Sequence, residues 1–152
     1  MAGRTVEATG GRELPEPPER VWAALAVLRP YCAVCDVTYV VTGSGRGSTF
    51  VCVPGRVDGA VPPSRGTRGE IVEWTPSRRV TTRLERAGEV WTTRLELTGT
   101  PSGGTDVAMT LGCEQTGNAL VGALQRRALQ RLVERTLAAE LVRLPEHVAQ
   151  LD

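Results

Sequence analysis

Residues 79–113 have the sequence RVTTRLERAGEVWTTRLELTGTPSGGTDVAMTLGC, in which three β-prone runs are separated by short turn segments. Apolar and polar positions alternate in each run, a pattern typical of strands with one buried and one solvated face. The inward set comprises Val80, Thr82, Leu84, Trp91, Thr93, Leu95, Leu97, Val107, Met109, Leu111 and Cys113. The other set includes Arg83, Glu85, Arg94 and Glu96, whose opposite charges can pair in water. The segment therefore predicts an antiparallel meander with one dry face.

Upstream of this segment, the sequence predicts further short strands at 4–14, 37–41, 50–52 and 67–74. Gly10 and Gly11 fit a bulge or bend in an edge strand. A proline-rich segment with early acidic residues, 15–19, predicts a short helix up to about Leu28, which Pro30 ends. Residues 31–35 are expected to form a turn or a second helical stub. The proline- and glycine-rich segment 54–66 is expected to be a loop that could serve as a lid.

The last segment, from Asn118 to about Leu144, is rich in Leu, Ala, Arg, Glu and Gln and predicts one long helix that ends before Pro145. Its apolar face comprises Val121, Ala128, Leu129, Leu132 and Val133, with Gln125 and Thr136 among them. We expect this face to pack on the dry side of the sheet. The predicted fold is one α+β domain, residues 1–152, in which a curved antiparallel sheet of about seven strands wraps around the helix. Two short helices are expected between strands one and two.

The charge balance argues against partners that bind by charge. Eighteen basic residues, all of them Arg, and 17 acidic residues give a net charge of +1. Nucleic acids and anionic membranes select a much stronger positive field, so neither is expected as a partner. The absence of lysine also excludes a lysine Schiff base with a carbonyl substrate.

The N-terminus has no apolar core of a signal peptide, and no stretch approaches the ~20 apolar residues of a membrane span. We therefore expect a cytoplasmic protein, monomeric or homodimeric. In that compartment Cys32, Cys35, Cys52 and Cys113 are expected to be reduced thiols that behave as small buried hydrophobes.

The order of elements resembles the helix-grip fold of the START/Bet v 1-like (SRPBCC) superfamily, and within it the bacterial polyketide cyclase/dehydrase group. The resemblance covers nearly the whole chain and rests on short motifs, which are residues 14–22, 74–80, 104–107 and 139–144. It implies a cavity between sheet and C-terminal helix for an apolar ligand such as a lipid, a polyketide or a quinone. Aromatase/cyclase members place an Arg and a Tyr in this cavity. The matching positions here hold Trp74 and Cys35, so those catalytic roles are not carried over. A tyrosine, Tyr39, lies two pleats from Cys35, and an arginine, Arg68, lies on the same predicted strand as Trp74.

A cavity of this kind would be lined by aromatic, soft and neutral polar residues. The expected ligand-binding residues are Tyr39, Phe50, Arg68, Val72, Trp74, Thr82, Trp91, Thr93, Met109, Gln125, Leu129 and Leu132. If Val72 and Trp74 face inward, a period of two also places Arg68 and Glu70 on that face. Glu70 would then be a candidate general acid or base, because an apolar pocket raises the pKa of a carboxyl group. The alternative is that Arg68 and Glu70 lie solvated at the rim.

Cys32 and Cys35 form a C-x-x-C motif, which is found in redox and zinc sites. A redox pair is expected at a helix N-terminus after a strand, and a zinc site is expected to have a second close pair; neither context is present. His147, the single histidine, is expected to be a surface residue near the frayed end of the helix. The sequence therefore predicts no metal and no cofactor.

Three functions are compatible with these features. The first is a polyketide cyclase/dehydratase-like enzyme, in which the cavity orients a reactive chain. The second is a non-catalytic carrier or sensor of a lipid, quinone or metabolite. The third is an interaction module that docks through the long helix. A cavity filled by side chains would favour this third function. The fold alone does not choose among them.

Overall fold

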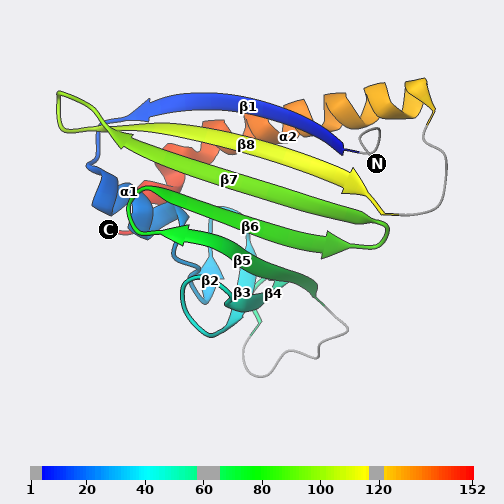
Figure 1. Ribbon diagram of the computed structural model, residues 1–152. Coiled ribbons are helices and arrows are strands. Elements are labelled where there is room, and N and C mark those ends of the chain that lie inside the picture. Colours follow the sequence, from blue (N-terminus) through cyan, green and yellow to red (C-terminus); the bar gives the residue numbers. More distant parts are fainter. Residues whose placement is uncertain (1–4, 58–65, 117–121) are drawn as a thin grey trace.

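The computed structural model describes residues 5–57, 66–116 and 122–152. An eight-stranded antiparallel sheet, in the order β1-β8-β7-β6-β5-β4-β3-β2, curves around one side of the long helix α2 (Figure 1). The strands are β1 (Thr5–Leu14), β2 (Tyr31–Cys32), β3 (Val37–Thr42), β4 (Thr49–Pro54), β5 (Thr67–Thr75), β6 (Arg79–Arg86), β7 (Glu89–Gly99) and β8 (Thr105–Gln115). Their order confirms the predicted meander, in which every strand from β2 to β7 pairs with the next one along the chain.

The segment between β1 and β3 differs from the prediction. It holds one short helix, α1 (Pro18–Leu25), and not two. Proline at the first helical positions and Glu19 in the first turn start α1 as expected. Residues 31–35, predicted as a turn or a second helical stub, form no helix: Tyr31–Cys32 are the strand β2, and the next residues form a turn. Tyr39 donates its backbone N–H to the Pro30 carbonyl at 2.9 Å and so holds this segment on β3. This added strand brings the sheet from about seven strands to eight.

Helix α2 (Ala123–Ala149) continues through Pro145, so the prediction that it ends before this proline was wrong. A proline inside a helix leaves the carbonyl four residues earlier without its usual N–H donor. That carbonyl belongs to Leu141, and the Arg12 guanidinium of β1 donates a hydrogen bond to it at 3.2 Å. The tertiary contact thus replaces the lost helical one. Residues 118–121, predicted to begin this helix, lie outside the described residues. Neither of the two described helices combines the length and the hydropathy that a membrane span needs.

Gly10 lets α2 pass close over β1. The register of β1 against β8 is continuous from Thr5 to Leu14, so the predicted bulge at Gly10-Gly11 is absent. A Cβ atom on Gly10 would lie 2.8 Å from Leu141 Cδ1 of α2. The glycine therefore serves the close approach of helix and strand and not a bend in the strand.

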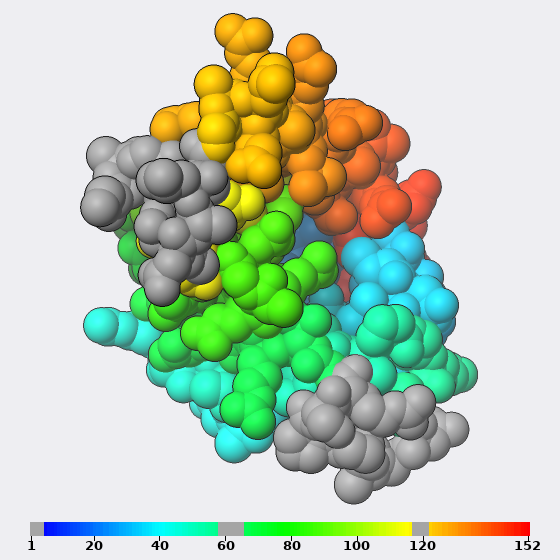
Figure 2. Space-filling view, turned by 90° about the vertical axis from the view of Figure 1, so that its right-hand side faces the viewer, coloured from blue at the N-terminus to red at the C-terminus, as the bar shows by residue number. Residues whose placement is uncertain are grey.

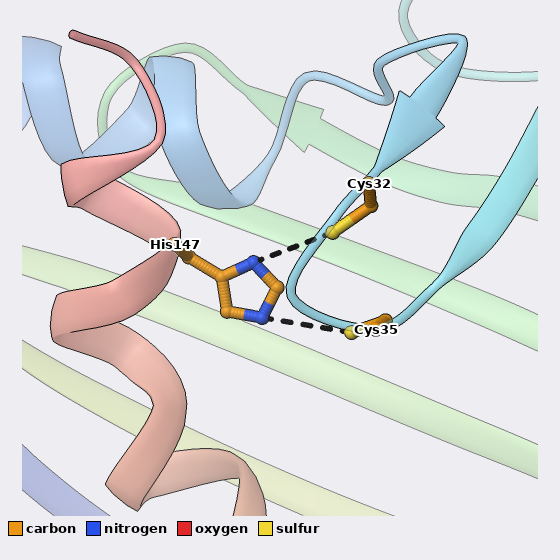
Figure 3. A group of neighbouring side chains, drawn as sticks. All are labelled: Cys32, Cys35 and His147. Carbon is orange, nitrogen blue, oxygen red and sulfur yellow. Dashed lines mark hydrogen bonds between the residues drawn. The ribbon is translucent and has the colours of Figure 1, made fainter.

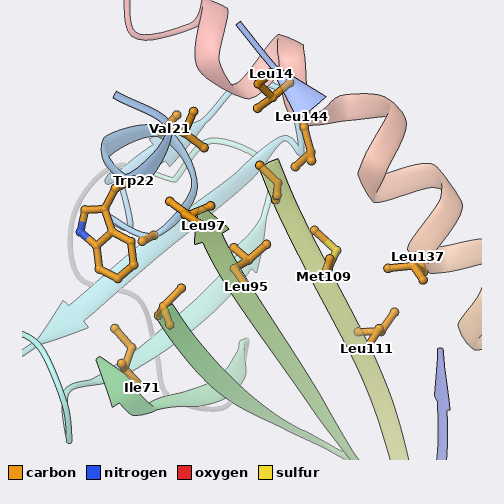
Figure 4. Close-up of a cluster of buried hydrophobic side chains, with 14 of the residues drawn as sticks. Leu14, Val21, Trp22, Ile71, Leu95, Leu97, Met109, Leu111, Leu137 and Leu144 are labelled. Atoms are coloured by element: carbon orange, nitrogen blue, oxygen red, sulfur yellow. The ribbon is translucent and has the colours of Figure 1, made fainter. Parts of the chain in front are cut away.

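The hydrophobic core lies where α1 and α2 meet the dry face of β7 and β8 (Figure 4). The inward set predicted from residues 79–113 supplies much of it, with Val80, Leu95, Leu97, Val107, Met109, Leu111 and Cys113 all buried. From the helices come Val21, Trp22, Leu129, Val133, Leu137, Leu144 and Val148. Because α2 contacts only β1, β8 and α1 closely, the concave face of the remaining strands is left uncovered by the helix.

Gly69 provides a test of packing on this concave face. A Cβ at this position would lie 2.3 Å from Phe50 Cζ and 2.9 Å from Leu84 Cδ2, and Phe50 is only 4% exposed. We expect Gly69→Ala to lower the free energy of unfolding by about 1–3 kcal/mol, because the Phe50 ring and the Leu84 methyl group must both shift to admit the new Cβ atom. The matched control is Gly112→Ala in β8, whose new methyl would meet a flexible Glu7 side chain at 3.4 Å. Urea denaturation of both variants measures the difference, and equal losses would contradict the close packing of Phe50 on β5.

Candidate functional site

A cavity of about 550 Å³ lies between the concave face of the sheet and α2. Its walls come from α1 and the segment after it, from β3 to β8, and from the cavity-facing side of α2. Figure 2 shows its opening as a hollow between α2, in orange, the β6–β7 hairpin, in green, and the cyan segment around β2 and β3. The volume lies within the range of roughly 300–1,000 Å³ that is typical of small-molecule sites.

Seven of the predicted ligand-binding residues line this cavity. They are Tyr39, Phe50, Thr82, Trp91, Thr93, Met109 and Leu132, joined by Thr136. Tyr39 and Phe50 pack edge to face with ring centroids 6.1 Å apart, which makes a stable aromatic wall on β3 and β4. Trp91 is held by a 2.8 Å hydrogen bond from its indole Nε1 to Glu89. Thr136 donates its hydroxyl to the Leu132 carbonyl at 2.8 Å, which leaves its methyl group and the lone pairs of the hydroxyl oxygen for a ligand.

The prediction that Arg68, Glu70, Val72 and Trp74 share the cavity face was wrong, because a bulge interrupts the period of two. The register of β5 against β6 shifts between Ile71 and Glu73, so the parity of β5 changes at Val72. Arg68 and Glu70 are exposed opposite Glu85 and Arg83 on the outer face. Trp74 packs edge to face on Trp22 at 4.9 Å and lies outside the cavity wall. Glu70 is therefore no candidate for chemistry inside the cavity.

Gln125 and Leu129 also lie outside the cavity wall. Gln125 is in the first turn of α2, and its Oε1 accepts the Gly122 backbone N–H at 3.1 Å, which caps the helix. Leu129 is buried in the core under α2. Gln125 is exposed, so the prediction that it faces inward was wrong, and the helix meets the cavity only from Leu132 onward.

Sequence reasoning missed the polar residues at the C-terminal end of α2. Glu140, Arg143, His147 and Gln150 line the cavity together with Arg29, which follows α1. Arg29 donates to the Gln150 carbonyl at 3.0 Å and ties this end of the helix to the α1 segment. Residues 132, 136, 140, 143 and 147 repeat every three or four positions and form one helical stripe. That spacing was a usable signal, but ending the helix at Leu144 hid it.

The sulfur atoms of Cys32 and Cys35 lie on either side of the His147 ring, although the two segments are more than one hundred residues apart (Figure 3). Cys32 Sγ is 3.7 Å from Nδ1 and Cys35 Sγ is 3.7 Å from Nε2. The Gln150 amide nitrogen lies 3.3 Å from Nδ1 and 3.5 Å from Cys32 Sγ. The prediction that His147 is a surface residue was therefore wrong: α2 extends past Pro145 and turns this side chain toward the C-x-x-C segment.

Burial and neighbouring groups set the protonation of these side chains. Burial, reinforced by the nearby Cys32, raises the pKa of the Cys35 thiol to about 12. Burial also raises the pKa of Cys52 to about 11 and raises the pKa of Tyr39. The pKa of His147 is lowered, chiefly by burial. In the absence of other cations, these two thiols, the phenol and the imidazole are therefore neutral near pH 7.

Solved structures with the same architecture cover nearly the whole chain. TTHA0849 from Thermus thermophilus superposes with a TM-score of 0.67 at 24% identity over 96% of this chain and 99% of its own. One half of StfQ, a di-domain ARO/CYC from the steffimycin biosynthetic pathway, gives 0.70 at 15% identity, covering 97% of this chain and 51% of its own. Norcoclaurine synthase from Thalictrum flavum gives 0.64 at 10% identity, covering 96% and 95%. No family model matches the sequence, and the search of curated proteins finds no match.

The chain shares the fold of these solved structures, in which a curved antiparallel sheet packs against a long C-terminal helix. The resemblance drawn from the sequence is thus confirmed at the level of the fold, which includes the antiparallel sheet and the long C-terminal helix. The helix-grip architecture also explains why the cavity lies where it does, because the helix closes only one edge of the curved sheet. The solved structures do not carry a reaction over to this chain, since their sequence identities are low.

Proposed function

We propose that this chain, as a single domain, binds a small hydrophobic molecule with a polar end, in the manner of a polyketide cyclase/dehydratase-like protein. The observation that carries this proposal is the cavity of about 550 Å³ between the sheet and α2. Its walls are largely aliphatic and aromatic, and polar groups are gathered near the C-terminal end of α2. This combination of an apolar wall with a few convergent polar groups is typical of ligand sites.

The distribution of groups indicates how such a molecule would be oriented. An apolar body would lie against Phe50, Leu84 and Trp91, where each buried CH₂ contributes about 0.8 kcal/mol. Oxygen atoms at its other end would lie near Tyr39 and Arg143, which can donate hydrogen bonds to carbonyl or hydroxyl groups. The sheet supplies the apolar contacts and α2 supplies most of the polar ones. An aromatic polyketide or a quinone has this distribution of groups.

A catalytic role is supported by the solved aromatase/cyclase domains StfQ and BexL, which superpose with TM-scores of 0.70 and 0.68. Against it stands the resemblance drawn from the sequence, which implies that the positions of the aromatase/cyclase Arg and Tyr hold Trp74 and Cys35. The alternative is therefore a carrier or sensor that uses the same cavity without chemistry. An open cavity favours both of these functions over an interaction module, because a module that docks through its long helix does not require a cavity.

Blocking the cavity tests the binding proposal. Thr93 of β7 lines the cavity, whereas its neighbour Thr92 faces the opposite side of the sheet, across from Arg83. We expect Thr93→Trp to weaken binding of the fluorescent probe anilinonaphthalene sulfonate by at least tenfold, which corresponds to about 1.4 kcal/mol, because the indole fills the space the probe needs. Thr92→Trp is the matched control and should bind like the unmodified protein.

Native mass spectrometry of the purified protein complements this titration. A bound small molecule that is present in the unmodified protein and in Thr92→Trp, but lost in Thr93→Trp, would identify the ligand class directly. If Thr93→Trp folds and binds the probe as well as Thr92→Trp does, the probe site is elsewhere and the proposal fails. Circular dichroism confirms that both variants are folded.

A further inference from the structure

We propose that Cys32, Cys35 and His147 form a Zn²⁺ site whose fourth coordination position opens into the cavity. Within the described residues, these three side chains place one ligand atom each within 4.8 Å of one another. Two cysteines and a histidine are ligands that zinc prefers. The proposal concerns the metal alone and does not depend on which molecule the cavity binds.

The distances come close to those of tetrahedral coordination. Zn–S bonds of about 2.3 Å and Zn–N bonds of about 2.0–2.1 Å, arranged tetrahedrally, place neighbouring ligand atoms about 3.5–3.8 Å apart. The two sulfur-to-nitrogen distances are both 3.7 Å. They involve different nitrogens of one ring, and one ligand atom from each residue lies within 4.8 Å of the others, so side-chain rotations of His147 and the cysteines must bring one nitrogen and both sulfurs to the bonding distances. Gln150 lies 3.3 Å from Nδ1 and can hold that nitrogen when Nε2 binds the metal.

The C-x-x-C segment is held in place by bonds that involve neither thiol. Residues 33–36 form the turn between β2 and β3, and Asp36 has a φ of 52°. The Tyr31 hydroxyl donates to Asp36 Oδ1 at 2.6 Å, and the Gly55 N–H donates to the Asp36 carbonyl at 2.7 Å. A fixed turn directs both sulfurs to the same side, toward α2, as Figure 3 shows. Little ordering is therefore left for the metal to impose on this segment.

A redox function fits these cysteines less well than a metal does. Reactive C-x-x-C pairs have a thiolate stabilised at a helix N-terminus, whereas Cys32 ends β2 and Cys35 lies in the turn that follows it. A metal cation supplies the missing positive charge. Binding of Zn²⁺ releases one proton from each thiol, and two thiolates neutralise the ion. A neutral site of this kind is compatible with the half-buried end of an apolar cavity.

The position of the cluster indicates an open site. Cys32, Cys35 and His147 all line the cavity, so three protein ligands hold one side of the ion and the fourth position faces the space where a ligand would lie. Three protein ligands with an open position are typical of catalytic zinc sites, whereas structural sites have four. Water or an oxygen atom of a cavity ligand would complete the coordination. Glu140 and Arg143 line the same end of the cavity and can contact that fourth ligand.

Cobalt substitution tests the site without any organic ligand. The reduced protein, stripped of metal with a chelator, is titrated with Co²⁺ and then with Zn²⁺. We expect one Co²⁺ per chain, a thiolate-to-cobalt charge-transfer band, intense visible bands of tetrahedral geometry, and loss of all of them when Zn²⁺ displaces Co²⁺. Cys35→Ser and His147→Ala should each weaken Zn²⁺ binding by more than about 100-fold, beyond the roughly 10–100-fold loss seen when an outer-shell partner is removed.

Cys52→Ser is the matched control, because Cys52 also lines the cavity but does not belong to the cluster. It should bind both metals as the unmodified protein does. Two results would overturn the proposal. The first is Co²⁺ binding without a thiolate charge-transfer band, or with the same affinity in Cys35→Ser and His147→Ala. The second is no metal binding by the reduced, folded protein. Probe binding in the Thr93→Trp experiment is independent of either result, so the two proposals can fail separately.

Discussion

Val133→Asp should prevent folding, whereas Leu132→Asp, one residue earlier in α2, should leave a folded protein. Val133 is fully buried, with 0% of its surface exposed, in the core where α2 packs on the sheet. An aspartate there would be a buried charge without a partner, which costs more than about 4–5 kcal/mol. Such a loss approaches the entire stability of about 5–15 kcal/mol that is typical of a domain. We expect insoluble expression or a chain without a cooperative unfolding transition.

Leu132 is 42% exposed and lines the cavity, so a carboxylate at this position can stay hydrated. We expect Leu132→Asp to lower the free energy of unfolding by about 1 kcal/mol or less, close to the range of surface substitutions. Thermal and urea denaturation of the two variants measures the contrast. Similar losses at both positions would mean that the space beside Leu132 is filled by side chains, and the cavity on which the binding proposal rests would be absent.

The sequence was sufficient to predict the sheet because its signal is local. The alternation in residues 79–113 depends only on neighbouring positions, and it placed Val80, Leu95 and Met109 on the buried face, where the structure has them. The bulge in β5 is different. No glycine or proline marks Val72, and the register shift follows from how β5 pairs with β6. One extra residue was enough to turn Arg68 and Glu70 from the predicted inner face to the outer one.

The end of α2 shows a second limit of sequence analysis. Pro145 is a reliable local signal for a helix end, yet Arg12, 129 residues away from Leu141, supplies the hydrogen bond that the proline removes. Because the helix continues, His147 reaches Cys32 and Cys35. The predicted context for the C-x-x-C motif was a second pair nearby in the sequence, but the third ligand comes from the far end of the chain. Such a cluster depends on tertiary structure and cannot be found from local spacing.

Trp22→Ala should mainly lower the stability of the fold, whereas Trp91→Ala should mainly weaken binding. Trp22 of α1 is 8% exposed and packs edge to face on Trp74 at 4.9 Å. Its removal leaves a hole in the core, and we expect a loss of about 3–5 kcal/mol in the free energy of unfolding. At about 2–4 °C per kcal/mol for a domain of this size, the melting temperature should fall by about 10 °C. Differential scanning calorimetry measures this shift.

Trp91 has one face against the cavity, so its removal enlarges a space that already exists. The stability loss should be less than half of that of Trp22→Ala, since fewer packing contacts and one hydrogen bond to Glu89 are lost. Binding of anilinonaphthalene sulfonate should weaken at least about fivefold in Trp91→Ala, or by about 1 kcal/mol, and stay unchanged in folded Trp22→Ala. If Trp22→Ala reduced binding as much as Trp91→Ala does, the core and the cavity would not be separate. Comparison of the two variants thus distinguishes a tryptophan that holds α1 on the sheet from one that contacts the ligand.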